Sequence, residues 1–116
     1  MTQDRFQSQV LDDPYRLPRD IVPTRYDLRL EPDLTNATFL GLATITLTVV
    51  QSTTVIVLNA LELVIDSAVT EDSQGYRERA AIDMDESLQR CRLTVPRPMA
   101  PGEWRLHLAF RGTLND

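Results

Sequence analysis

The strongest constraint in this sequence is a two-residue alternation of apolar and polar side chains. It is clearest near the C-terminus, where Trp104, Leu106, Leu108 and Phe110 alternate with Arg105, His107, Ala109 and Arg111. Successive side chains of a β-strand point to opposite faces, so one face of this segment is apolar and the other is mostly polar. The pattern is typical of a half-buried antiparallel strand.

The same alternation predicts further strands, separated by short runs of turn-forming residues. In chain order, the expected strands cover residues 26–31, 39–49, 54–58, 61–66, 80–84, 88–95 and 104–111. No window has helical periodicity over ten or more residues. We therefore expect an all-β fold, an antiparallel β-sandwich or curved sheet of about seven short strands joined by sequential hairpins.

Segments without alternation divide the chain. Residues 1–14 are polar, which predicts a flexible leader before a β-sandwich domain at 15–116. Two prolines in the segment 15–24 exclude a regular helix, and we interpret this segment as an extended strap lying on a sheet. Three prolines make residues 96–102 a rigid connection. Gly41 interrupts an apolar run and indicates a β-bulge or a close backbone approach.

Composition excludes several classes of function. The formal net charge is -5, which argues against nucleic-acid binding, because phosphates require clustered basic residues. All 12 basic residues are arginines and are spread along the chain. This usage indicates a GC-rich, bacterial genome, and an anion site built from arginines is the alternative. No apolar stretch approaches the roughly 20 residues that span a bilayer, so we expect no membrane association.

Cysteine usage and the N-terminal residues indicate a cytoplasmic location. Cys91 is the single cysteine, and one cysteine cannot close an internal disulfide. The first residues have no apolar core of a signal peptide.

Candidate catalytic and metal-binding residues are few. His107 falls in the polar register of its strand, so we expect an exposed histidine with no nucleophile beside it, a minor partner contact being the alternative. Cys91 falls on an apolar face and is expected in the core. The acidic cluster at 83–86 reads as solvated turn residues, with a weak calcium site as the alternative. We therefore expect no catalytic, cofactor-binding or metal-binding residues in this chain.

Four short segments together carry a resemblance to a known family. They are Leu17-Pro18 followed by Val22-Pro23-Thr24-Arg25-Tyr26, then Phe39-Leu40-Gly41, then Ile56-Val57-Leu58-Asn59-Ala60, and finally Phe110-Arg111-Gly112-Thr113-Leu114-Asn115-Asp116. In this order and spacing, they resemble the start of the N-terminal domain of zinc aminopeptidases of the aminopeptidase N family (peptidase family M1).

The resemblance implies a division of labour between domains. Family members have a β-rich, saddle-like N-terminal domain, followed by a catalytic domain with a Gly-x-Met-Glu-Asn segment and a zinc-binding His-Glu-x-x-His. Neither motif occurs in this sequence. The chain is then a non-catalytic structural fragment of an enzyme that releases N-terminal amino acids from peptides. The catalytic domain of the same polypeptide is its expected partner, and zinc is expected only there.

Two other functions stay open from the residues alone. The first is a free-standing β-sandwich module that binds a protein or peptide by strand addition. The second, a metal-dependent or hydrolytic enzyme, is disfavoured by the inventory of one histidine and one cysteine. An incomplete sheet also predicts exposed apolar surface and self-association through an open edge.

Overall fold

The computed structural model describes residues 20–60, 62–85 and 87–114. These residues form eight strands: β1 (Ile21–Asp33), β2 (Thr38–Val49), β3 (Thr53–Asn59), β4 (Leu63–Glu71), β5 (Arg77–Arg79), β6 (Ala81–Asp85), β7 (Arg90–Met99) and β8 (Gly102–Thr113). The expected leader, residues 1–14, lies outside the described residues. Within the described part, no helix is long and apolar enough to cross a membrane.

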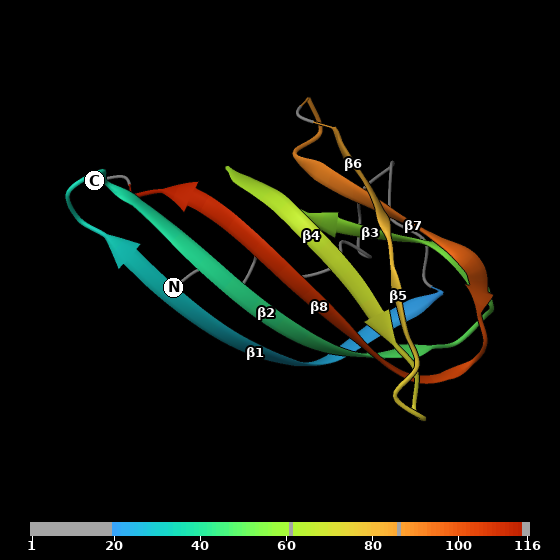
Figure 1. The fold of residues 1–116 in the computed structure, drawn as a ribbon. Coiled ribbons are helices and arrows are strands. Elements are labelled where there is room, and N and C mark those ends of the chain that lie inside the picture. Colours follow the sequence, from blue (N-terminus) through green and yellow to red (C-terminus); the bar gives the residue numbers. More distant parts are fainter. Residues whose placement is uncertain (1–19, 61, 86, 115–116) are drawn as a thin grey trace.

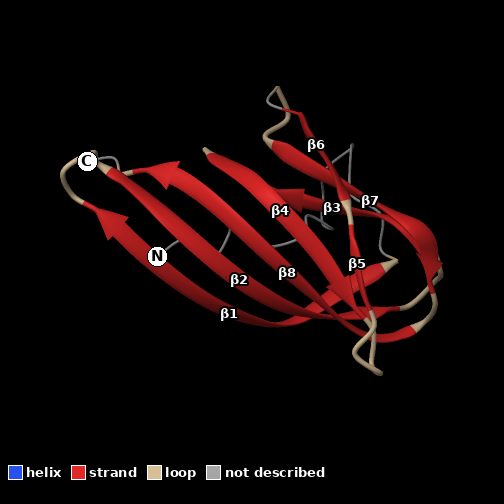
Figure 2. Ribbon diagram, viewed as in Figure 1, coloured by secondary structure: helices blue, strands red, loops and turns tan. Residues whose placement is uncertain are grey.

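The strands form two antiparallel sheets, which confirms the all-β prediction. One sheet has the order β1-β2-β8-β4-β5, and the other has the order β3-β7-β6. In Figure 1, the long strands of the larger sheet lie side by side in one curved layer, with the smaller sheet packed at one end. For the described residues, Figure 2 shows strands joined by loops and turns, with no helix. There are eight strands rather than about seven, because the three-residue β5 is too short for its alternation to be detected.

The expectation of sequential hairpins is wrong for half of the pairing, because three of the six strand pairs join strands that are not neighbours in sequence. Neighbours in sequence pair as β1–β2, β4–β5 and β6–β7. The last strand, β8, lies between β2 and β4, and β7 lies between β3 and β6. Both sheets are therefore assembled by pairing between distant parts of the chain, which an alternation pattern cannot specify.

The expected strap is in part a strand of the sheet. From Ile21 onward, these residues pair with β2, starting opposite Val49, and a bulge between Pro23 and Arg25 absorbs one extra residue. A proline is tolerated there because β1 is an edge strand.

The expected connection at 96–102 is also in part a strand, since β7 continues to Met99. Its two prolines lie where the pairing with β3 skips from Thr94 to Met99. The pairing of β7 with β3 therefore requires no backbone N–H from either proline, and the φ angle of proline is compatible with an extended strand.

Gly41 does not form a bulge, because β2 pairs in continuous register with β8 on this side. A close approach is present, but it is made by a side chain rather than by the predicted backbone: a Cβ atom at Gly41 would lie 2.2 Å from Cζ of the Phe110 ring. The arrangement is reciprocal, since a Cβ atom at Gly112 would lie 2.6 Å from Cζ of Phe39. Phe39 lies opposite Gly112 and Phe110 opposite Gly41, so each ring covers the glycine of the neighbouring strand.

Candidate functional site

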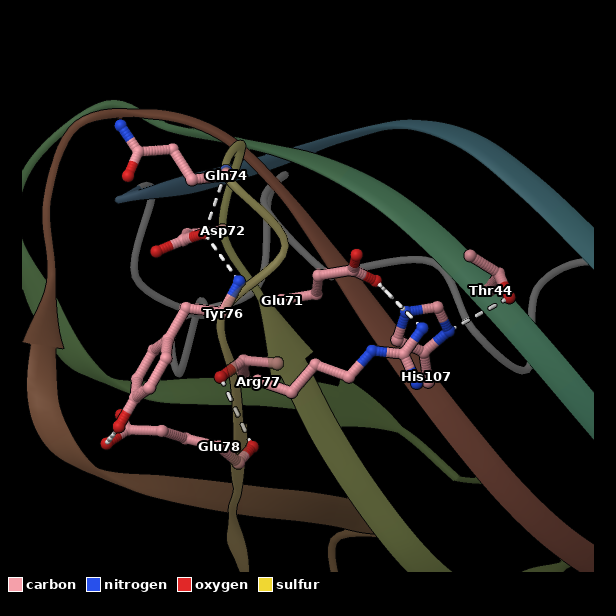
Figure 3. A network of polar contacts seen from close by, with 9 residues as sticks. Thr44, Glu71, Asp72, Gln74, Tyr76, Arg77, Glu78 and His107 are labelled. Atoms are coloured by element: carbon pink, nitrogen blue, oxygen red, sulfur yellow. Dashed lines mark hydrogen bonds and ion pairs between the residues drawn. The ribbon is translucent and has the colours of Figure 1, made fainter.

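The most organised group of polar side chains lies on the outer face of the five-stranded sheet, the face turned away from the smaller sheet. His107 of β8 stands between Thr44 of β2 and Glu71 of β4 (Figure 3). Its Nε2 is 2.7 Å from Glu71 Oε1, and its Nδ1 is 3.3 Å from Thr44 Oγ1. A carboxylate only accepts hydrogen bonds, so Nε2 carries the proton, and in the neutral imidazole Nδ1 accepts from the threonine hydroxyl.

The expectation of an exposed His107 is therefore wrong. Only 27% of its side chain is exposed, because polar neighbours from β2 and β4 flank it. Glu71 is 15% exposed and also lies 3.3 Å from Nη2 of Arg77. The hydrogen bond from His107, followed by the positive charge of Arg77, lowers the pKa of the Glu71 carboxyl. This carboxylate is consequently held in its ionised form between two donors.

The order Thr44–His107–Glu71 resembles the connectivity of a hydrolytic triad, but the setting does not suit one. Acyl transfer requires backbone N–H groups directed at the developing oxyanion. Thr44 and His107 lie opposite one another in the β2–β8 ladder, where neighbouring backbone groups are engaged with each other. The arrangement therefore serves as a polar clamp across β2, β8 and β4.

A second polar cluster joins the two sheets. Arg97 of β7 donates from Nε to Glu78 Oε2 of β5 at 2.9 Å, and its Nη2 donates to the Tyr76 hydroxyl. The hydrogen bond to Glu78 is the main reason that the pKa of Arg97 is raised. Asp72 Oδ1 accepts from the backbone N–H groups of Gln74 and Tyr76, at 2.8 and 2.9 Å, and so fixes the turn that presents Tyr76 (Figure 3).

Cys91 lies in the core as predicted. Its side chain has no exposed surface, and burial raises the pKa of the thiol to about 11, with the charge of Asp83 as a smaller cause. A thiol with a raised pKa is a poor nucleophile at neutral pH.

Within the predicted acidic cluster at 83–86, the carboxylate of Asp85 accepts hydrogen bonds from its own turn, and residue 86 lies outside the described residues. Asp85 Oδ1 accepts from Ser87 Oγ at 2.8 Å and from Leu88 N at 3.2 Å. The hydrogen bond from Ser87 is the largest cause of the lowered pKa of Asp85. Among residues 20–60, 62–85 and 87–114, no group of three or more His, Cys, Asp or Glu side chains is placed to hold a metal ion.

A shallow apolar hollow is the other feature of the larger sheet. It has a volume of about 560 Å³ and is lined by Leu40, Leu42 and Ala109 together with Arg29, Glu31 and Asp66. Leu40 and Leu42 are 57% and 54% exposed. Asp66 is paired with Arg111, whose Nε lies 3.1 Å from Oδ1. Sequence reasoning missed this surface, because both leucines interrupt the alternation at the start of β2 rather than continue it.

Comparison with known proteins gives a consistent result. The model of the Peptidase M1 N-terminal domain matches residues 22–116. Aminopeptidase M1-D of Oryza sativa subsp. japonica is 38% identical over 102 residues, and puromycin-sensitive aminopeptidase of Caenorhabditis elegans is 33% identical over 102 residues. Both alignments cover 87% of this chain and 11% of the relative.

Solved structures agree with the sequence relatives. An M1 zinc metallopeptidase from Deinococcus radiodurans superposes with a TM-score of 0.63 at 28% identity, covering 82% of this chain and 21% of that chain. A mutant of a two-domain M1 zinc metallopeptidase bound to L-tryptophan gives a TM-score of 0.64 at 28% identity.

Proposed function

Because this chain belongs to the Peptidase M1 N-terminal domain family, we propose that it is the leading, non-catalytic part of a zinc aminopeptidase. The parent enzyme releases N-terminal amino acids from peptides. The observation that carries the proposal is the extent of the match: relatives named as aminopeptidases align with most of this chain but are covered over only 11–12% of their own length. We place the catalytic residues in the part of the longer protein that corresponds to the uncovered length of these relatives.

The zinc of the parent does not fit the residues present here. Both ring nitrogens of His107 already make hydrogen bonds, to Glu71 and Thr44. Cys91 is buried in the core, and the pKa of its thiol is raised. A catalytic zinc requires three protein ligands and an open position. We therefore assign zinc binding and peptide substrates to the parent's catalytic domain.

We assign a bracing role to this domain, with the catalytic domain of the same polypeptide as its partner. Leu40, Leu42 and Val64 are 57%, 54% and 42% exposed on the outer face of the larger sheet. Adjacent exposed apolar side chains around a hollow are typical of surfaces that contact another protein part. Burial of this patch against the longer protein contributes roughly 25 cal/mol per Å² of apolar surface removed from water.

Leu42→Asp in the longer protein tests this role, with Leu34→Asp as a matched control. Leu34 is 83% exposed in the β1–β2 turn, so both variants place the same charge on an exposed leucine. Leu42→Asp is expected to lower the melting temperature of the longer protein and to increase proteolysis between its domains, whereas Leu34→Asp is not. In the isolated chain, both variants are expected to melt near the wild type. Equal behaviour of the two variants in the longer protein would refute the brace.

The reading frame after residue 116 tests the assignment itself. A His-Glu-x-x-His sequence downstream is the expected result. A stop codon at that point would instead favour a free-standing binding module. A bacterial source and a cytoplasmic location belong to the same proposal, supported by the all-arginine basic residues and the unpaired Cys91. Cell fractionation tests the location.

A further inference from the structure

The outer edge of β1 is the longest open strand edge in the described structure. β1 spans 13 residues and pairs with β2 on one side. Within residues 20–60, 62–85 and 87–114, no strand pairs with its other side. An unpaired edge presents a row of backbone N–H and C=O groups to any further strand. Prolines, which cannot donate, occupy positions 23 and 32, so residues 25–31 form an uninterrupted window between them.

The charges in this window alternate in sign on one face of the sheet. Arg25, Asp27, Arg29 and Glu31 lie opposite outer-face residues of β2. All four are exposed, and the side chains of Arg25 and Asp27 are 72% and 54% exposed. Charged side chains on an edge strand normally prevent edge-to-edge association. Because the charges of this window alternate in sign, a second copy of the same strand, running antiparallel, can present the complementary charges. For that partner the charges favour edge-to-edge association.

We propose that two copies of this chain pair along β1 as an antiparallel, two-fold symmetric dimer with Leu28 on the axis. In that register, Arg25 lies opposite Glu31, and Asp27 lies opposite Arg29. The two-fold axis repeats both pairs, so every charged residue of the window faces an opposite charge. Directly opposed, oppositely charged side chains stabilise an antiparallel strand pair.

Neighbouring registers are excluded by the same charges. Opposed residues of the two copies project their charged side chains on the same face of the joined sheet only if the two-fold axis passes through a residue. Moving the axis by one residue changes the residue opposite any given position by two. With the axis at Asp27, two aspartates meet and Arg25 lies opposite Arg29. With the axis at Arg29, two arginines meet and Asp27 lies opposite Glu31. Opposed like charges are destabilising, and among registers centred within the window only the one with Leu28 on the axis places each of the four charged residues opposite a residue of opposite charge.

The inner face of β1 supports the same register. Tyr26, Leu28 and Leu30 lie opposite Ile45, Ala43 and Gly41 on the core side of the sheet. Leu28 and Leu30 nevertheless remain 42% and 57% exposed. In the dimer, Leu28 lies beside its own copy, and Leu30 lies opposite Tyr26. Apolar side chains thus gain cross-strand neighbours on one face while charges pair on the other.

Charge-swap variants of the chain test the proposal. Asp27→Arg and Arg29→Asp each place like charges in the central pairs, so each variant alone is expected to be monomeric. An equimolar mixture of the two restores opposite charges in both central pairs and is expected to form a heterodimer. The double variant Asp27→Arg/Arg29→Asp is expected to form a homodimer again. Glu103→Arg is the control, because it changes the net charge as Asp27→Arg does, but at an exposed position of β8.

Sedimentation velocity measures the fraction of dimer from micromolar concentrations to about 1 mM. This range is needed because an interface made by one short strand pair is small and binds weakly. The wild type and Glu103→Arg are expected to dimerise with similar affinity, and each single swap is expected to weaken dimerisation at least about tenfold. Circular dichroism verifies that every variant is folded. A wild type that stays monomeric throughout, or a dimer that tolerates both single swaps, would overturn the proposal. Failure of the mixed single variants to associate would also overturn it.

Discussion

Gly41→Ala is the substitution that tests the packing of the larger sheet most sharply. The added methyl group would lie 2.2 Å from Cζ, 2.4 Å from Cε2 and 2.8 Å from Cε1 of Phe110, so it meets the ring over much of its face. Ordinary carbon contacts are about 3.5–4.0 Å, so the ring must move by more than about 1 Å. Phe110 is 2% exposed and packs edge-on against Phe39, with ring centroids 6.3 Å apart, so its displacement disturbs buried packing.

Overpacking of this kind costs about 1–3 kcal/mol, and we expect the upper half of that range because an aromatic ring is displaced within a core. For a domain of this size, this corresponds to a melting temperature lowered by roughly 8–20 °C. Thermal unfolding followed by circular dichroism measures the effect. Phe110→Leu removes the ring, so the double variant should be more stable than the sum of the two single changes predicts, by about 1 kcal/mol or more. A Gly41→Ala variant as stable as the wild type, or strict additivity of the two changes, would contradict the close packing of Phe110 on Gly41.

Three further predictions concern groups with altered pKa values. The thiol of Cys91, with its pKa raised to about 11 by burial, should react with a disulfide reagent at neutral pH only after unfolding, and rapid reaction of the folded chain would contradict this. Glu71 has a lowered pKa in the folded state, so its contribution to stability is complete above its ordinary value of 4.5 and is lost as the pH falls. Urea unfolding should therefore show the stability difference between wild type and Glu71→Gln shrinking below that pH. Burial raises the pKa of Tyr26 to about 12, so the unfolded state loses its proton first and stability falls as the pH rises from about 10 to 12; Tyr26→Phe should reduce this alkaline loss.

Local pattern was sufficient to identify most strands and part of the core. The apolar face of Leu106, Leu108 and Phe110 and the inward position of Cys91 follow from the strict alternation in β8 and β7, and burial confirms them. Gly41 was predicted to mark a bulge or a close backbone approach, and the structure instead places a side chain against it. The identity of the approaching group, a phenylalanine ring on β8, depended on pairing between residues far apart in the sequence.

The polar clamp was not predictable for the same reason. Glu71 is 36 residues from His107, and Thr44 is 63 residues from it. Thr44 and His107 occupy polar registers of expected strands, which was the available signal, whereas Glu71 lies beyond the strand expected at 61–66 because β4 continues to Glu71. Their meeting, however, requires β8 to enter between β2 and β4, and alternation fixes which face a side chain occupies rather than which strand lies beside it.

Zinc content and aminopeptidase activity, measured on the purified chain and on the longer protein in parallel, show whether this chain is the non-catalytic domain of a zinc aminopeptidase. After equilibration with zinc and removal of the excess, the chain is expected to retain no stoichiometric metal and to hydrolyse no aminoacyl anilide. The longer protein is expected to retain zinc and to hydrolyse these substrates. Stoichiometric zinc or hydrolysis in the isolated chain would contradict its assignment as a non-catalytic domain, and an inactive, zinc-free longer protein would contradict the proposed parent.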